Sequence, residues 1–271
     1  MLSEDQIKNR DVPLVFGYGG GVNSMAGLIT LRDHDIVPDL VSFADTGDEK
    51  PETYDYMLDV AEQWLKENGF PSITTVKKQS PRTGDNSLEE ECLRRETLPS
   101  RAFGMSSCAM RWKIEPQEKF LNNWKPAMDS WGAGKKPVKV LGIDDGESHR
   151  AIIVEDKKLL YWYPLVYYGL DREDCVSLIQ RNGLKVPVKS ACFYCPSSKK
   201  SEVLSLKNNH PDLCARALRM EEVALSSTRH NLRNVKGLGR HWSWRDLLDS
   251  SEEDLVKYDE TPVESCMSCQ D

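Results

Sequence analysis

Short apolar runs alternate with amphipathic segments through the first two-thirds of this 271-residue chain. Four runs have the length of buried strands: residues 13–18, 39–45, 73–78 and 138–143. Three segments between them have helical spacing: residues 23–33, 52–69 and 113–124. Strands that alternate with helices pair in parallel through right-handed crossovers. We therefore expect an α/β fold with an open, mainly parallel sheet and helices on both faces.

The pattern becomes helical toward the C-terminus. Helical spacing covers residues 171–183, 200–226 and 242–258, and the last dozen residues form a polar tail. We therefore expect two parts, an α/β domain over residues 1–169 and a helical, cysteine-bearing portion over residues 170–271.

Composition excludes several classes of protein. No stretch approaches the roughly 18 apolar residues of a membrane span, and residues 1–13 lack the apolar core of a signal peptide. We expect a soluble, cytoplasmic protein with no membrane partner. Eight cysteines in such a protein indicate reduced thiols, metal or redox chemistry rather than a disulfide framework. A net charge of −7 argues against a protein that coats nucleic acid without specificity.

Three consecutive glycines, Gly19, Gly20 and Gly21, join the first strand to the first helix. A glycine-rich turn at this place presents backbone N–H groups and the positive end of a helix dipole, which together favour phosphate. The spacing matches neither a Walker A loop nor a dinucleotide fingerprint. Two interpretations stay open from these residues alone: a phosphate-binding loop, or a tight turn packed closely on the sheet.

Six motifs occur in one order across residues 13–222: GGGVNS, FADTGDEKPETY, SSCAMRWKIEPQEKFL, GIDDGESHR, YWYPLVYYGLDREDCVSLI and ACFYCP. In this order they resemble the motifs of the adenine nucleotide alpha-hydrolase (PP-loop) superfamily, and in particular its phosphoadenosine phosphosulfate reductase-like branch. The resemblance implies a Rossmann-like (HUP) fold, with residues 1–169 as an adenine-nucleotide-binding domain.

The resemblance also assigns residues to the nucleotide. The loop that would hold the phosphates comprises Gly19, Gly20, Gly21, Val22, Asn23 and Ser24. Asp45 and Thr46 end the second strand and Gly142 lies in the fourth, where they would contact the nucleotide. Catalytic roles fall to Asp45, Lys113 and Arg150. Lys113, together with Arg111, would neutralise phosphate or a departing anion, and Arg150 would clamp a phosphate or sulfate. The alternatives are a turn pair for Asp45 and Thr46, a solvated face for Lys113 and a structural ion pair for Arg150.

Two positions depart from the pattern of the superfamily. Gly19 stands where the loop usually has Ser, and Asn23 stands where it usually has Asp. Carboxylate-assisted binding of Mg²⁺ would then come from elsewhere, with Asp45, Asp144 and Asp145 as candidates. ATP and Mg²⁺ are the expected ligands. Backbone N–H groups can still bind the phosphates, whereas the two departures weaken the case for ATP cleavage.

Cysteines carry a second signal. Cys192 and Cys195 lie in one turn before a proline, a common way to present two thiolates to one metal centre. Cys108 matches a position that supplies a ligand in the iron–sulfur members of the branch, whereas Ser107 replaces the neighbouring cysteine. Cys214 is the expected fourth ligand, and a half-buried helical cysteine is the alternative for it. We expect a [4Fe-4S] cluster, with Zn²⁺ as the alternative.

Two further segments bear on partners. The tail holds Cys266 and Cys269, and Cys269 would act as a catalytic thiol that carries sulfur or resolves a disulfide; incidental cysteines in a disordered tail are the alternative. Residues 229–248 interleave five Lys or Arg side chains with two Trp. Cations hold phosphates and Trp faces stack on bases, so tRNA or DNA is a candidate partner; a Trp-anchored structural helix is the alternative.

Three functions follow from these features. The expected one is a PP-loop enzyme that cleaves ATP at the α-phosphate to AMP and pyrophosphate, adenylating an acceptor for sulfur transfer to a nucleic acid or nucleotide. It would take sulfur from a donor protein. The first alternative is an adenylyl sulfate or phosphoadenosine phosphosulfate reductase, and the second is a nucleotide-sensing binding module.

Overall fold

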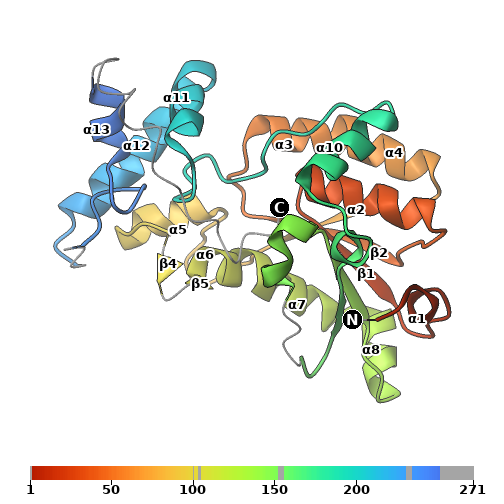
Figure 1. Cartoon of the computed structure of the whole chain (residues 1–271). Helices are drawn as coiled ribbons and strands as arrows, with labels where there is room; N and C mark the ends of the chain where they lie inside the picture. The colour runs from red at the N-terminus through yellow and green to blue at the C-terminus, as the bar shows by residue number, and fades with distance from the viewer. Residues whose placement is uncertain (1, 100, 103–104, 152–155, 230–233, 251–271) are drawn as a thin grey trace.

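The fold is an open, all-parallel sheet of five strands with helices on both faces (Figure 1). The computed structural model describes residues 2–99, 101–102, 105–151, 156–229 and 234–250. The strand order is β3-β2-β1-β6-β7. The strands are β1 (Leu14–Tyr18), β2 (Leu40–Asp45), β3 (Ile73–Lys77), β6 (Val138–Leu141) and β7 (Leu160–Trp162). The predicted fold class is confirmed, and further helices follow toward the C-terminus.

Helices make up most of the remaining described structure. Along the chain they are α1 (Glu4–Lys8), α2 (Val22–Asp33), α3 (Pro51–Tyr56), η1 (Met57–Ala61), α4 (Glu62–Glu67), α5 (Leu88–Arg95), α6 (Ser107–Ala109), η2 (Met110–Ile114), α7 (Glu115–Leu121), α8 (Lys125–Gly132), η3 (Asp145–Arg150), α9 (Pro164–Tyr167), α10 (Arg172–Arg181), α11 (Lys200–Asn209), α12 (Pro211–Ser226) and α13 (Trp244–Asp249). η1 and η2 are π-helical turns, and η3 is a 3₁₀ helix. A two-stranded antiparallel pair joins β4 (Arg101–Ala102) to β5 (Met105–Ser106). None of the helices in the described ranges combines the length and apolar character that a bilayer crossing needs.

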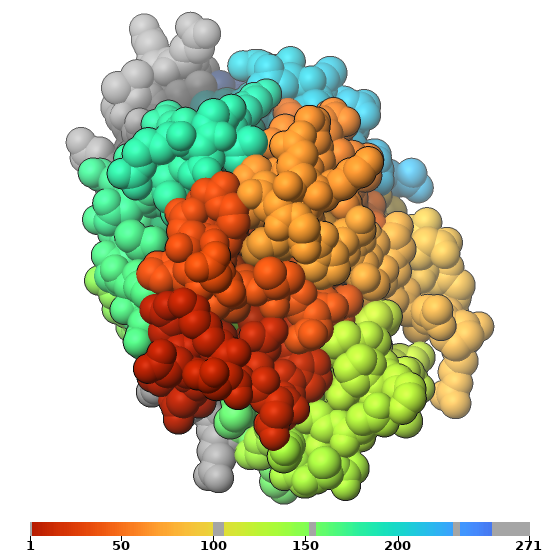
Figure 2. All heavy atoms as spheres, turned by 90° about the vertical axis from the view of Figure 1, so that its right-hand side faces the viewer, coloured from red at the N-terminus to blue at the C-terminus, as the bar shows by residue number. Residues whose placement is uncertain are grey.

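Successive side chains of β1 enter different cores because strand side chains alternate between the two faces of a sheet. Leu14 and Phe16 lie in the main core, which α2, α3, η1, α4, α9 and α10 complete. Val15 lies in a smaller core on the opposite face, where Leu121 of α7 packs against it. Figure 2 shows the first of these faces, with α2 between α10 and the α3–α4 segment. The sheet is therefore covered on both sides, as a parallel sheet requires.

A separate core holds the C-terminal helices together. It contains buried side chains of α5, α11, α12 and α13, together with Trp112 from η2. In Figure 1, α11, α12 and α13 stand beside α5, away from the sheet. Chain segments on both sides of residue 169 contribute to both cores, because Cys175 of α10 lies in the main core and Trp112 in this one. The division of the chain at residue 169 stays a prediction.

Several elements differ from the sequence expectation, among them the following. The strand β7 and the helix α5 lie in segments without a clear hydrophobic period, so the sequence did not predict them. The predicted helix over residues 113–124 begins at Ser107, and its first full turn is the π-helical η2. The predicted helix over 200–226 is two helices, since Pro211 lacks the N–H that a continuous helix needs and instead begins α12.

Candidate nucleotide site

The glycine loop lies where the order of strands in the sheet reverses. β1 pairs with β2 on one side and with β6 on the other, and all three run parallel. In open α/β sheets, ligands bind at the carboxyl ends of the strands at such a reversal. Tyr18 ends β1 and Val22 begins α2, so residues 19–21 form the turn at that place.

Two glycines are required by close packing around this loop. Gly20 has φ +83°, a left-handed conformation, and a Cβ there would lie 2.8 Å from Thr53 Cγ2 and 3.3 Å from Ser190 Oγ. Gly142 directly follows β6, and a Cβ there would lie 2.6 Å from the carbonyl oxygen of Asn23. The end of β6 therefore presses against the first turn of α2, which fixes the position of that turn.

The first turn of α2 presents backbone donors at its N-terminus. Gly21 is the N-cap residue, and its N–H donates to Ser24 Oγ at 3.1 Å. The next three N–H groups, those of residues 22–24, have no partner within the helix because a helix begins with unsatisfied donors. The first turn carries no acidic side chain. This end of α2 therefore has the donors and the dipole sign that suit a phosphate.

Asn23 holds a carboxylate beside the loop. Its Nδ2 donates to Asp144 Oδ2 at 3.0 Å, and Arg172 Nη1 donates to its Oδ1 at 2.8 Å. Both Asn23 and Asp144 are buried. An Asp at position 23 would place two carboxylates in contact, which the amide of Asn23 avoids. Asp145 is exposed and lies outside this network.

Asp45 organises the turn after β2. Its Oδ1 accepts hydrogen bonds from Tyr54 Oη at 2.6 Å and Gly47 N at 2.8 Å, and its Oδ2 lies 2.8 Å from Lys77 Nζ. Burial alone would raise the pKa of Asp45, but Lys77, Tyr54 and Gly47 hold the pKa below its ordinary value. Asp45 is therefore ionised, and both of its oxygens bind the protein.

Lys113 connects to the glycine loop through two residues that the sequence analysis did not single out. Lys113 Nζ lies 3.2 Å from Glu49 Oε1. Ser190 Oγ lies 3.1 Å from Glu49 Oε2 and 2.6 Å from the carbonyl oxygen of Gly19. Glu49 lies inside the motif FADTGDEKPETY and Ser190 directly precedes ACFYCP. Their positions in or beside these motifs are the signal by which the sequence could have identified them as site residues.

Arg150 forms an ion pair within its own short helix. Arg150 Nη1 lies 2.5 Å from Glu147 Oε2 in η3, and the arginine side chain is 5% exposed. This geometry agrees with the alternative of a structural ion pair. A role of Arg150 at the nucleotide stays a prediction.

Cys192 lies at the same end of the sheet as the loop. It forms an isolated antiparallel bridge with Glu49, and its Sγ lies 3.1 Å from Thr46 Oγ1. Burial, followed by the charge of Glu49, raises the pKa of the Cys192 thiol well above its ordinary value. The thiol is therefore protonated in this structure.

The other predicted metal ligands have different surroundings. Cys195 N donates to the carbonyl oxygen of Cys192 at 3.0 Å, which closes a turn. Cys108 packs against the C-terminal core, and Cys214 is buried within it. Burial raises the pKa of the Cys214 thiol, and the nearby charges of Lys207 and Arg245 oppose that rise.

The described cysteines do not form the expected metal centre. Within residues 2–99, 101–102, 105–151, 156–229 and 234–250, no three His, Cys, Asp or Glu side chains gather in a way that could hold a metal ion. Cys266 and Cys269 lie outside the described residues. The described donors therefore do not fit a [4Fe-4S] cluster or Zn²⁺, and such a centre stays a prediction.

The basic segment 229–248 is anchored by its tryptophans. Trp244 is 1% exposed within the C-terminal core, and Trp242 stacks against it with ring centroids 6.5 Å apart. The buried carboxylate of Glu221 accepts hydrogen bonds from four groups of the segment: Leu238 N, Ser243 Oγ, Trp244 N and Arg245 N. Trp244 therefore cannot stack on a base in this conformation, which agrees with the alternative of a Trp-anchored structural element.

Comparison with known proteins gives similarity to solved structures but no match in sequence. No protein-family model matches the sequence, and no curated protein matches it. Among solved structures, the chain is similar to the U34-tRNA thiolase NcsA from Methanococcus maripaludis, described with its [4Fe-4S] cluster. The TM-score is 0.43 and the identity 15%, over 96% of this chain and 85% of that chain. A likeness of this size assigns neither a family nor an activity to this protein.

Proposed function

We propose that this protein binds an adenine nucleotide at residues 19–24 and cleaves ATP at the α-phosphate, adenylating an acceptor for sulfur transfer to a nucleic acid or nucleotide. One observation carries the proposal: a glycine loop and a helix N-terminus lie at the carboxyl end of β1, where the strand order reverses. The order of the six sequence motifs supports the choice of an adenine nucleotide.

The chemistry of the proposed reaction follows from the charges around the loop. An acceptor oxygen attacks the α-phosphorus of ATP, the bond from that phosphorus to the bridging oxygen breaks, and pyrophosphate leaves with the bridging oxygen. Sulfur then displaces AMP from the acceptor. The N–H groups of residues 22–24 hold phosphate oxygens, and Lys113, linked to Gly19 through Glu49 and Ser190, neutralises charge on the departing pyrophosphate.

A divalent cation would complete this site. The Asp144 carboxylate is buried beside Asn23 at the loop, and carboxylate oxygens are the ligands that Mg²⁺ prefers in proteins. Mg²⁺ held by Asp144 and the phosphates would neutralise charge on the pyrophosphate. Asp45 is less suited to this role because Lys77 already neutralises its carboxylate, whereas the donors to Asp144, Asn23 Nδ2 and Glu147 N, are neutral.

The ion pair between Asp45 and Lys77 favours a second candidate function. Because this carboxylate and the Arg150 guanidinium both take part in ion pairs with the protein, a nucleotide-sensing module that binds without turnover fits these two residues. The reductase alternative depends on Cys269, which lies outside the described residues.

Product analysis with a matched pair of variants tests the proposal. The anaerobically purified protein is incubated with α-labelled ATP, tRNA or DNA, and a sulfur donor, and in parallel with adenylyl sulfates. We expect AMP and pyrophosphate from the wild type, no turnover from Asp144→Asn, and wild-type turnover from the control Asp145→Asn, because Asp145 is exposed and outside the network. Sulfite without pyrophosphate would establish the reductase, and ATP binding without products would establish the binding module.

The metal centre has its own test. Iron, sulfide and zinc are measured in the anaerobically purified protein and in two variants, Cys192→Ala and the control Cys175→Ala. Cys175 is a buried side chain of the main core and no predicted ligand. Loss of metal in the first variant alone would support the predicted ligand, and full metal content in Cys192→Ala would contradict it.

A further inference from the structure

A pocket rich in arginine opens beyond the carboxyl end of β3. It has a volume of about 530 Å³, and its lining includes five cationic side chains and two carboxylates, which leaves three positive charges in excess. The cations are Lys78, Arg82, Arg94, Arg95 and Arg111. The chain as a whole carries a net charge of −7, so this local excess of cations is opposite in sign to the rest of the protein.

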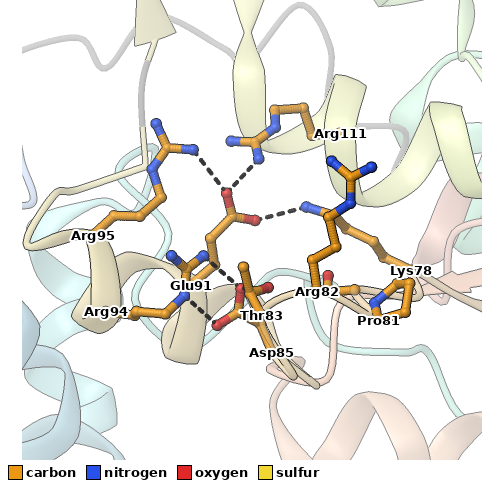
Figure 3. Close-up of a pocket in the computed structure, with 10 residues that line it drawn as sticks. Lys78, Pro81, Arg82, Thr83, Asp85, Glu91, Arg94, Arg95 and Arg111 are labelled. Atoms are coloured by element: carbon orange, nitrogen blue, oxygen red, sulfur yellow. Dashed lines mark hydrogen bonds and ion pairs between the residues drawn. The ribbon is translucent and has the colours of Figure 1, made fainter.

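The pocket is a built feature, because buried carboxylates hold its cations in place. Figure 3 shows three side chains converging on Glu91. Its oxygens lie 2.7 Å from Lys78 Nζ, 3.2 Å from Arg95 Nη1 and 2.5 Å from Arg111 Nη2, and the Glu91 side chain is only 4% exposed. Arg94 forms a two-pronged pair with Asp85, through Nε at 2.8 Å and Nη2 at 2.6 Å.

The charged ends of the arginines remain accessible to a ligand. The side chains of Arg94, Arg95 and Arg111 are each more than 40% exposed, although their carboxylate partners are buried. A guanidinium has five N–H donors, and one carboxylate uses at most two of them. Arg82 is exposed and makes no hydrogen bond or ion pair with any residue that the structure describes. The pocket therefore offers converging donors and an excess of positive charge to an oxyanion.

The pocket lies toward the same edge of the sheet as the candidate nucleotide site. Lys78 directly follows β3, which lies two strands from β1 in the sheet. Neighbouring strands are about 4.8 Å apart, so this end of β3 and the glycine loop are on the order of 10 Å apart. The π-helical η2 also spans both sites, since Arg111 points to Glu91 in the pocket and Lys113 pairs with Glu49 beside the loop.

We infer that this pocket binds a phosphate group of the acceptor, a phosphate ester carried by a nucleic acid or by a nucleotide, and so sets the acceptor next to the bound ATP. The inference rests on the proposed function, since it names the group by which the acceptor is held. The lining residues include no aromatic side chain, so the donors of the pocket suit a phosphate better than a stacked base.

The salt dependence of binding tests this inference without ATP. The affinity for a fluorescein-labelled single-stranded RNA is measured by anisotropy from about 50 to about 200 mM KCl. The pocket variant is Arg82→Gln with Arg95→Gln, which leaves Lys78 and Arg111 to neutralise Glu91. Two contacts to a single strand at about 0.7 each should reduce the slope of log K against log salt by about 1.4. Affinity should fall about tenfold or more at the lower salt, and Arg82→Gln alone should show half the change in slope.

Two control variants locate the effect. Lys125→Gln removes an 83% exposed lysine of α8 and should bind RNA as the wild type does. Lys236→Gln with Arg245→Gln removes two exposed cations of the 229–248 segment. An unchanged slope in the pocket variant, or a change that appears only in the 229–248 variant, would overturn the inference.

Further ligands distinguish a nucleotide from a polynucleotide as the source of the phosphate. They also distinguish failure of this inference from failure of the proposed function. A mononucleotide whose affinity falls in the pocket variant identifies a nucleotide acceptor, whereas loss of RNA affinity alone identifies a polynucleotide. Loss of adenylyl sulfate binding with unchanged RNA binding would overturn the inference in favour of a sulfate site. Calorimetry with ATP is run on the same variants, because absence of ATP binding in the wild type would refute the proposed function while the RNA result still decides on the pocket.

Discussion

Replacement of Gly142 by Ala should displace the glycine loop by a small and measurable amount. The new Cβ would lie 2.6 Å from the carbonyl oxygen of Asn23 and 2.9 Å from its carbonyl carbon, whereas ordinary contacts begin near 3.4 Å. The first turn of α2 and the end of β6 must therefore separate by about 0.8 Å, and overpacking of this kind costs about 1–3 kcal/mol of folding free energy. Gly142 has no left-handed φ, so the strain comes from contact alone.

The displacement acts on the donors that we assign to phosphate. A hydrogen bond of about 2.9 Å that lengthens by about 0.8 Å no longer has bonding geometry. Loss of one bond to a charged group weakens binding by about 1.5–3 kcal/mol, which is about a tenfold to 150-fold loss of ATP affinity.

Calorimetry with ATP measures this loss, and denaturant unfolding measures the cost to the fold. The control is Gly132→Ala at the end of α8, where no atom lies within 4 Å of the new Cβ and the φ angle is ordinary. We expect wild-type affinity from the control, and a stability equal to the wild type or up to about 1 kcal/mol higher, because Ala favours the helix more than Gly does. ATP affinity that is unchanged in Gly142→Ala, together with a lower stability, would refute the assignment of this loop to phosphate.

Three further changes probe the surroundings of the site and the core. Asn23→Asp should destabilise the protein by about 1–3 kcal/mol by placing a carboxylate against Asp144, and the added change Asp144→Asn should restore the melting temperature; no change in the single variant would contradict the network. Lys139→Met should stabilise the protein by up to about 3 kcal/mol at pH 7, because burial lowers the pKa of Lys139 from 10.5 to about 8 and the folded protein binds that proton less tightly than the unfolded chain does. Since the penalty disappears as the pH rises from about 8 through 10.5, the gain should shrink to roughly half or less at about pH 9.5, and equal gains in denaturant unfolding at both pH values would exclude the charge as the cause. Glu221→Gln should raise the rate of backbone amide hydrogen exchange across residues 236–248. The glutamine amide presents an NH₂ group to the N–H donors and loses about 3 kcal/mol or more of hydrogen bonding. Unchanged protection from exchange would show that Glu221 is not the anchor of this segment.

The sequence by itself determined the class of fold and the place of the glycine loop. Four apolar runs and the helices between them repeat periods that the backbone imposes locally, so a parallel sheet could be predicted without any knowledge of contacts. Gly20 shows the same local logic, because a turn from a strand into a helix needs a residue that tolerates a positive φ. The strand β7 escaped prediction because three residues are too few to show a period.

Only the tertiary structure decided which side chains meet. Asn23 and Asp144 are 121 residues apart, and Ser190 reaches Gly19 across 171 residues, because parallel crossovers bring the carboxyl ends of distant strands to one edge of the sheet. The burial of Trp244 and the convergence of three cations on Glu91 likewise depend on how helices pack. The hydrophobic period of a sequence reports which face of a helix or strand is buried, but it carries no information on the partner that buries that face. The charge network around the loop and the arginine-rich pocket therefore emerged only from the packed chain.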